Sequence, residues 1–477
     1  MLLVHPVHEV LRQLPLLIGS IVLGSATNNP LWSLLGLGLV VALGVARWFT
    51  TTFRIDADEV QLRVGVLQRS VLSVPRNRIR SVQTDARPLH RLLGLTVLRV
   101  STGQEAHGDR AFELDAVPAR EVPRLRAILL AFDEDTGEPT PDAPTRSIEL
   151  ARWQPSWLRY SPLSMSGLVM IAAAVGLIYQ TGLGLALQRS EVVESGLDAA
   201  ARFGAASIAA ALAVLVLLAS VLLSVGRSLL TYGNLVLRRR STHATDTLHL
   251  QHGLVRVREH TYDMSRLRGG TIREPLLVRA FGGARLDAVM TGVNGAGEAS
   301  LLLPPCPAGT AQGVLAALIG DDAAVSAQLQ RHGRAAARRR WTRGLLLPAV
   351  VGVTLVILGF FADVPGWSWW ALLVLTVCCA LLAADRVRAL GHRVDSHWLV
   401  ARSGSVERRR DCIAAAGIIG WTVRQSPFQR RSGVATLIAA TAAGTKRYVV
   451  IDVPADLAWT VAATASPWVA DCAWASQ

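Results

Sequence analysis

Long apolar runs separate stretches in which apolar and polar residues alternate. Six of the runs are each about long enough to cross the hydrocarbon core of a bilayer as a helix, and they occur in close pairs. The pairs are 11–27 with 31–48, 163–187 with 203–225, and 345–361 with 367–384. The pattern therefore predicts six membrane spans arranged as three helical hairpins.

The charges around these runs predict how the hairpins are oriented. Arginines flank the outer ends of each pair, whereas the hairpin tips at 28–30, 188–202 and 362–366 carry little positive charge. By the positive-inside rule, the tips face outward, and both termini and the soluble parts are cytoplasmic. Aromatic residues gather at the span ends, where they are expected to lie at the membrane interface. These are Trp48, Trp153, Trp157, Tyr160, Trp341, Trp367, Trp369 and Trp370.

The stretch after the first hairpin has the alternation typical of short antiparallel strands. From residue 53 apolar and polar positions alternate, with turns expected at 56–58 and 64–65. Further strands are expected at 78–84, 96–101 and 111–115, and Pro118 opens a helical pattern that ends near Phe132. Residues 133–145 are acidic and rich in proline, which indicates an exposed linker.

An internal repeat links this stretch to two later ones. Counted from Gly65, the recurring positions are an arginine at +13, an arginine at +26, a glycine at +29 and a leucine at +33. The three series are Gly65, Arg78, Arg91, Gly94, Leu98; Gly253, Arg266, Arg279, Gly282, Leu286; and Gly404, Gly417, Arg430, Gly433, Leu437. They align without a gap, and Gly417 replaces the first arginine in the third. The repeating unit is therefore a hairpin followed by a small β domain.

We accordingly divide the chain into three hairpins and three soluble blocks. The hairpins are 1–50, 151–227 and 344–386. The first block is 51–132, the second block 228–320 and the third block 387–477. A linker at 133–150 and a basic juxtamembrane helix at 321–343 complete the division. The expected fold class is an α+β membrane protein with three cytoplasmic antiparallel β domains, each closed by a C-terminal helix.

Two neighbouring segments of the first block carry a family resemblance. Residues 75–82, PRNRIRSV, and 88–100, PLHRLLGLTVLRV, resemble the core motif of the bacterial pleckstrin-homology-like membrane proteins of type 2. The resemblance implies a PH-like fold of two packed antiparallel sheets capped by a helix, attached to paired membrane spans. It implies architecture more than activity. The second block departs from the motif with Asp263 at the position of Pro75, and the third with Ala414.

Composition agrees with a membrane protein that has basic soluble parts. Half of the residues are apolar, and the net charge is +14. Lys446 is the only lysine, so the arginine content reflects a compositional bias and its abundance is no evidence of ligand binding. Positive charge lies near the membrane boundaries without interleaved stacking aromatics, which argues against a nucleic-acid partner.

The sequence offers no catalytic or metal-binding motif. GxSxG, phosphate-loop and HExxH patterns are lacking, and the five cysteines form no CxxC pair. His249, His252 and His260 are close in sequence but lack a carboxylate or thiolate at ligand spacing, so we expect solvated strand or loop histidines. The prediction is a protein that is not an enzyme and has no cofactor or metal.

Arginines provide the candidate contacts. Arg76, Arg78 and Arg80 alternate along one strand and share a face, which favours either a solvated surface or contact with anionic lipid headgroups. Arg91, Arg279 and Arg430 are expected either to fix a short helix or to meet a headgroup or protein partner. Basic residues at 331–343 are expected to anchor the chain electrostatically at the membrane. Gly94, Gly282 and Gly433 are expected in tight turns with positive φ, and Gly65, Gly253 and Gly404 mark further structural positions.

Two functions remain open at this point. The first is a non-enzymatic scaffold, or an envelope-stress or membrane-homeostasis factor, that binds a protein such as a smaller single-domain relative, or another copy of itself. The second is an anionic-lipid or small-molecule handling component of an export or resistance complex for membrane-active compounds. Both place the protein in the cytoplasmic membrane, in contact with the lipid bilayer.

Overall fold

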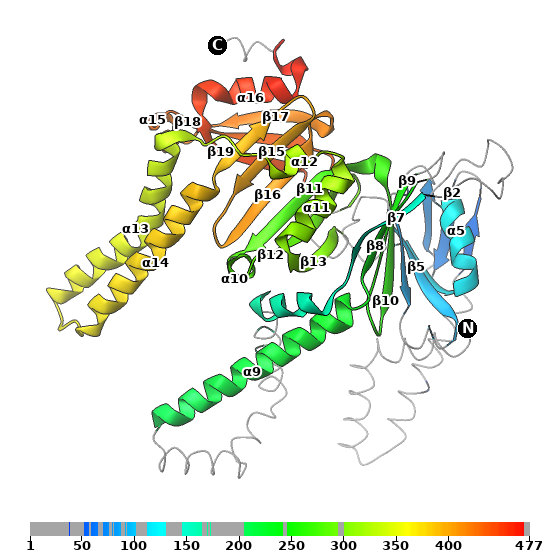
Figure 1. Ribbon diagram of the computed structural model, residues 1–477, viewed down its shortest axis with the longest axis horizontal. Coiled ribbons are helices and arrows are strands. Elements are labelled where there is room, and N and C mark those ends of the chain that lie inside the picture. The colour runs from blue at the N-terminus through cyan, green and yellow to red at the C-terminus, as the bar shows by residue number, and fades with distance from the viewer. Residues whose placement is uncertain are drawn as a thin grey trace. The chain divides into compact units, whose positions relative to one another are not determined.

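The computed structural model describes most of the soluble blocks and three long helices (Figure 1). Its described residues are 52–56, 59–64, 70–75, 79, 81–86, 91, 93–101, 112–129, 146–164, 205–241, 246–293 and 300–471, with single residues 38, 169 and 172. Antiparallel strands dominate the soluble part, in agreement with the predicted class of β domain.

Each block contributes six strands and a helix after the last strand. The first block has β1 (Thr52–Ile55), β2 (Glu59–Val64), β3 (Ser70–Pro75), β4 (Ser81–Ala86), β5 (Leu95–Ser101), β6 (Phe112–Pro118) and α5 (Val122–Leu129). The second has β8 (Val236–Ser241), β9 (Asp246–His252), β10 (Val257–Asp263), β11 (Leu267–Pro275), α10 (Leu276–Ala280), β12 (Gly283–Met290), β13 (Leu301–Pro307) and α11 (Ala308–Ile319). The third has β14 (Gly391–Val394), β15 (Trp398–Ser403), β16 (Glu407–Ala414), β17 (Ile418–Arg424), α15 (Pro427–Arg431), β18 (Val434–Thr441), β19 (Arg447–Pro454) and α16 (Ala458–Ala465).

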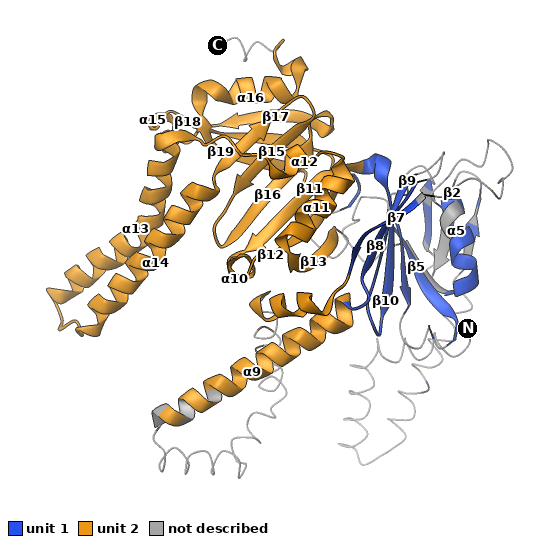
Figure 2. Ribbon diagram, in the orientation of Figure 1, with its two compact units in different colours: residues 1–152, 233–266, 291–293 blue, residues 153–232, 267–290, 294–477 orange. Residues whose placement is uncertain are grey.

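The chain forms two compact units that do not follow the order of the blocks (Figure 2). One unit contains residues 1–152, 233–266 and 291–293, and the other contains 153–232, 267–290 and 294–477. The strands of the second block are therefore divided, with β8 to β10 in the first unit and β11 to β13 in the second.

The first unit contains a three-stranded and a seven-stranded sheet. The small sheet has the order β1-β2-β3, and the large one has the order β6-β5-β4-β10-β9-β8-β7. Strand β7 (Arg146–Arg152) pairs with β8 at one edge of the large sheet. Residues 146–150, which the sequence placed in a linker, thus belong to a strand, while 133–145 lie outside the described residues.

The second unit contains a six-stranded and a three-stranded sheet. The larger has the order β13-β12-β11-β16-β15-β14, and the smaller has the order β17-β18-β19. All pairs in both sheets are antiparallel.

Alternation along the strands builds the cores of the first and third blocks. In the first block, Val60, Val82 and Leu98 are buried together with Val122 and Leu129 from α5. The third block has a corresponding core of strand residues covered by α16, formed by Leu399, Ile413, Leu437, Val450 and Val461 among others. Each fully buried aliphatic side chain of this size contributes about 1.5–3 kcal/mol. Sheet residues packed under a C-terminal helix are the arrangement that the PH-like resemblance implies.

Three of the described helices are long and apolar enough to cross a membrane. They are α9 (Ala205–Tyr232), with the apolar stretch 213–232, α13 (Gly333–Gly359) and α14 (Trp367–Ala389). These correspond to the predicted spans 203–225, 345–361 and 367–384. The other three predicted spans lie outside the described residues apart from single positions, so six spans remain a prediction.

Helices α13 and α14 form a hairpin in which small residues meet (Figure 1). A Cβ atom built on Gly344 would lie 2.7 Å from the Cβ of Ala383, so a side chain there would push the helices apart. The basic segment predicted as a separate helix at 321–343 is divided instead. Residues 322–326 form α12 (Asp322–Ser326), and the arginines after Gly333 lie in the first turns of α13 itself.

The interfacial aromatics behave in two ways. Trp367 and Trp370 are exposed at the start of α14, as residues at a membrane interface are expected to be. Trp157 and Tyr160 are buried instead, in the 3-10 helix η3 (Pro155–Tyr160). The ring of Tyr160 packs on the backbone of Gly283, where a Cβ would lie 2.5 Å from it. The prediction that these two residues lie at the membrane interface was therefore wrong.

The same glycine turn occurs once in each block. Gly94, Gly282 and Gly433 have φ values of +66°, +74° and +66°. Each N–H donates to the carbonyl of the arginine three residues earlier, at 3.2, 2.9 and 3.2 Å. Each glycine carbonyl in turn accepts a bond, at 2.9 to 3.0 Å, from the alanine that follows the last strand of its block. The turn thus ties the short helical segment to the beginning of the C-terminal helix.

The loss of stability caused by a glycine-to-alanine substitution should depend on the backbone conformation and on the space around the glycine. Gly433→Ala is expected to lower the free energy of unfolding by about 1–2 kcal/mol, because φ is positive but the space is open. Gly404→Ala should cost more, since its Cβ would also collide with the carbonyl group of Glu407. Gly313→Ala in α11 is the control and should cost nothing. Unfolding of the full chain in detergent provides the measurement, and equal effects at Gly433 and Gly313 would contradict the argument.

Candidate functional site

Strand pairing between consecutive blocks is the main structural feature that the sequence did not predict. In the first unit β4 of the first block pairs with β10 of the second, with Ser81 opposite Tyr262. In the second unit β11 of the second block pairs with β16 of the third, with Gly269 opposite Ile413. Gly269 occupies the position of Ser81 in the repeat, and Ile413 that of Tyr262. We call the pairing of β4 with β10 the first junction and the pairing of β11 with β16 the second junction. The two junctions have the same register.

The repeat arginine at +26 makes the same contact in both junctions. Arg91 donates from Nη1 to the carbonyl of Leu254 at 3.4 Å, and Arg279 donates from Nη1 to the carbonyl of Ser405 at 3.3 Å. Leu254 directly follows Gly253, and Ser405 directly follows Gly404. Each glycine lies in the turn between the second and third strands of the next block. Arg91 and Arg279 therefore each contact the backbone of the following block, a contact that the sequence did not predict.

An ion pair crosses each junction. The residue on the preceding block is acidic in the first junction and basic in the second, and its partner has the opposite charge. Asp85 pairs with Arg256 in the first junction. In the second, Arg273 pairs with the half-exposed Glu407 at 3.2 Å and also with the buried Asp287 of its own block at 2.6 Å. Arg273 stands at the position of Asp85 in the repeat, and Glu407 at that of Arg256. Pairing β4 with β16 would place two carboxylates together, so the exchange favours the observed partners.

The first of these ion pairs is well defined electrostatically. Burial raises the pKa of Asp85, but the hydrogen bond and the charge of Arg256 outweigh it, and the pKa lies below its ordinary value. Asp85 is therefore ionised at neutral pH. Its side chain is almost fully buried, which makes the contribution of Arg256 larger than that of a surface partner.

The third hairpin is attached to two blocks through two carboxylates, the partly exposed Asp385 and the buried Asp452. Asp385 near the end of α14 accepts from Arg279 at 2.8 Å and from Arg408 at 2.7 Å. Asp452 in β19 is fully buried and pairs with Arg339 at 3.2 Å and Arg340 at 2.7 Å. These two α13 arginines were expected to anchor the chain to lipid. They bind a carboxylate inside the protein instead.

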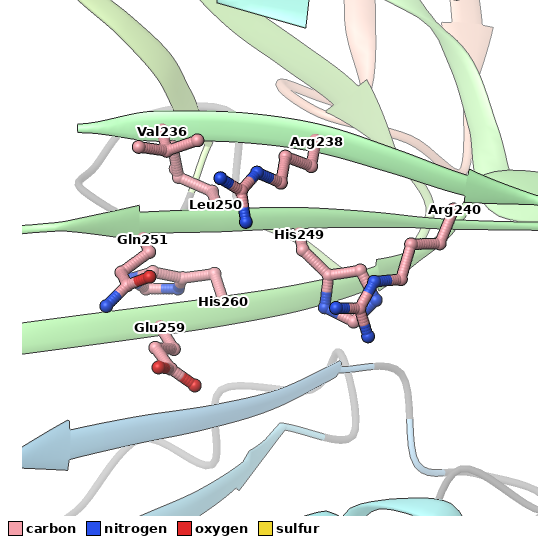
Figure 3. A pocket seen from close by; sticks show the side chains of 8 residues that line it. All are labelled: Val236, Arg238, Arg240, His249, Leu250, Gln251, Glu259 and His260. Atoms are coloured by element: carbon pink, nitrogen blue, oxygen red, sulfur yellow. The ribbon is translucent and has the colours of Figure 1, made fainter. Parts of the chain in front are cut away.

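The polar face of β8 to β10 has a small pocket of about 140 Å³ (Figure 3). Arg238 and Arg240 alternate on β8, and Arg238 also lies 3.4 Å from Glu149 of β7. His249 is held by the hydroxyls of Thr247 and Thr261, each at 3.1 Å. The pocket residues are Val236, Arg238, Arg240, His249, Leu250, Gln251, Glu259 and His260. Two guanidinium groups beside an imidazole form a site suited to a small anion.

The nearby histidines differ from the solvated side chains that the sequence led us to expect. His252 and His260 are buried and stacked with their ring centroids 5.8 Å apart. Burial, then the neighbouring His252 and Arg258, lower the pKa of His260 to about 4. It is therefore neutral at physiological pH. The described residues hold no group of three or more His, Cys, Asp or Glu side chains arranged for a metal ion.

The remaining predicted positions divide into two groups. Arg76, Arg78, Arg80 and Gly65 lie outside the described residues, so their shared strand face stays a prediction. Arg430 is described and exposed, and together with Gln425, Pro427 and Arg431 it lines a surface hollow of about 420 Å³. Gly253 and Gly404 have φ values of +106° and +97°. They lie in the turns whose backbone carbonyls accept hydrogen bonds from Arg91 and Arg279.

Comparison with known proteins agrees with the architecture. The family model described as bacterial PH domain matches residues 10–132 and 345–465, which together are about half of the chain. Each match covers a predicted hairpin and the block that follows it. No curated protein and no solved structure matched the chain.

Exchanging the charges at the first junction should test its ion pair. Asp85→Arg is expected to lower stability by about 2 kcal/mol, because two guanidinium groups would then face each other across the junction. Adding Arg256→Asp should recover much of the loss. Hydrogen exchange of segments 81–86 and 257–263 in the full chain provides the measurement. Asp56→Arg at an exposed pair is the control, with an expected change within about 0.5 kcal/mol. Failure of the double variant to recover would count against a specific pair.

Proposed function

The chain belongs to the bacterial PH-domain family, and we propose that it is a non-enzymatic scaffold of the cytoplasmic membrane with a role in envelope stress or membrane homeostasis. Its apolar helices would hold the PH-like blocks against the inner surface of the membrane. The blocks would then bind a protein partner through their sheets.

The pairing of strands between blocks is the observation that carries this proposal. Two junctions in one register extend the sheets across block boundaries, and an arginine and an ion pair fix each of them. Two carboxylates, Asp385 and the buried Asp452, attach the third hairpin to the second and third blocks. Each unit therefore joins parts of two consecutive blocks in one sheet, which suits a scaffold that positions partners.

The pocket on β8 to β10 favours the second candidate, the handling of anionic lipids or small molecules in an export or resistance complex. Arg238 and Arg240 would bind the anionic group there. This candidate depends on a pocket of about 140 Å³, enough for a phosphate-sized group but not for a whole lipid.

Co-purification of the full chain in mild detergent separates the two candidates. The scaffold predicts a stoichiometric protein, either a different protein or a second copy carrying another tag. Asp85→Arg, which opens a junction, should reduce its recovery by about tenfold, equivalent to 1.4 kcal/mol. Replacing Arg238 and Arg240 with Gln should leave it unchanged. Loss of a bound anionic lipid in that double variant, without any protein partner, would overturn the scaffold in favour of the second candidate.

The orientation can be tested independently. A reporter enzyme that is active only outside the cytoplasm is expected to stay silent when it is fused after Gln477, because the arginine-rich flanks of the spans retain the soluble parts inside. The same reporter inserted at Asp363, in the tip between α13 and α14, should be active. Activity at the C-terminus would contradict the proposed topology.

A further inference from the structure

Each junction is made by two particular strands of a block. The fourth strand of one block, β4 or β11, pairs with the third strand of the next block, β10 or β16. In every block, the third strand can therefore pair with the preceding block, and the fourth strand can pair with the following block. With three blocks in the chain, the two junctions use four of the six edges.

One of the two remaining edges is β17 in the third block. It is the counterpart of β4 and β11, and it is an outer strand of the sheet β17-β18-β19 in the described part of the chain. Thr422 on β17 is exposed, whereas Thr271, at the same repeat position in β11, is only 4% exposed because β16 covers it. Ile419, near the beginning of the same strand, is 68% exposed. An open, apolar strand edge of this kind readily accepts another strand.

The side chains that complete a junction are also in place beside β17. Arg430 is the counterpart of Arg91 and Arg279, and it is exposed at a hollow of about 420 Å³. Phe428 stands beside it, 74% exposed. The third block thus has an arginine at the position that makes the junction contact in the first and second blocks.

The other remaining edge is β3 in the first block. It is the counterpart of β10 and β16, and within the described residues it is the outer strand of the sheet β1-β2-β3. Val71, the second residue of β3, is 58% exposed. Among the described strands, the two edges that pair with no other block are therefore the two complementary halves of the junction that the chain already makes twice.

We propose that β17 of one molecule pairs with β3 of a second copy of this chain, in the register of the two internal junctions. This inference rests on the proposed scaffold function and names its partner. The register places Val423 opposite Val71 and Gly420 opposite Val74. Arg430 takes the role of Arg91 and Arg279. Because the two halves lie on different blocks, the contact is head to tail and generates a ring or an open row of molecules.

Disulfide trapping between two differently tagged full-length chains tests the register. One chain carries Val71→Cys and the other Val423→Cys, and both are expressed together and oxidised in their own membranes. Opposed residues of antiparallel strands have Cα atoms about 4.5–5.5 Å apart, which suits a disulfide. The expected result is a mixed-tag disulfide dimer. A link inside a single chain cannot produce this species.

The matched control shifts the register by two residues on the same strand face. Ser73→Cys combined with Val423→Cys places the sulfur atoms on diagonal neighbours about 7–8 Å apart, beyond the usual disulfide range. Each substituted chain paired with an unsubstituted one measures the background from the five native cysteines. Absence of the mixed dimer, or equal yield from the shifted pair, overturns the proposal.

A second variant pair tests Arg430 without altering the strand. Arg430→Gln is expected to reduce the mixed-dimer yield at least about fivefold, since it removes a charged hydrogen bond. Arg431→Gln removes the same charge from the same hollow and should leave the yield within about twofold. Equal effects of the two variants would also overturn the proposal. If the mixed dimer is absent while a different protein co-purifies stoichiometrically, the scaffold function stands and only the self-pairing fails.

Discussion

Main-chain hydrogen bonding at the edges of sheets is the constraint on which this structure depends. A strand at a sheet edge has a row of N–H and C=O groups that must be bonded to another strand or to water. The second block satisfies this requirement on both sides, through β10 against β4 and β11 against β16. Its strands are consequently divided between two compact units, although they form a contiguous stretch of sequence. The blocks are therefore not independent domains joined by linkers.

Charged side chains select which strands pair, and they also attach the long apolar helices to the sheets. The exchanged pairs Asp85 with Arg256 and Arg273 with Glu407 distinguish two junctions whose backbone register is the same. The partly exposed Asp385 and the fully buried Asp452 each pair with two arginines and so connect α14 and α13 to the sheets. Removing one member of such a buried pair leaves an unpaired charge, which typically costs about 3–5 kcal/mol. The hairpin is therefore held to the second and third blocks by ion pairs as well as by the chain itself.

Sequence patterns were sufficient for the local structure and insufficient for the pairing. Alternation placed most strands of the first block within a few residues, and repeat spacing identified the glycine turns at Gly94, Gly282 and Gly433. Alternation specifies which face of a strand is buried but not which strand lies beside it, so the junctions were missed. The charge exchange between aligned repeats was the available signal. Basic residues were equally ambiguous: Arg339 and Arg340 were assigned to lipid because their partner Asp452 is more than a hundred positions away.

The complementary edges of each block have a consequence for how such a chain can grow. A tandem duplication of one hairpin with its block adds one strand of the β3 type and one of the β17 type. The new copy covers the edge left by its predecessor and presents an equivalent edge of its own. Gene duplication can therefore lengthen the series without redesigning an existing interface. Chains with different numbers of blocks should be able to join their blocks by the same strand pairing. Later charge changes, such as the exchange at Asp85 and Arg273, would then determine which blocks pair.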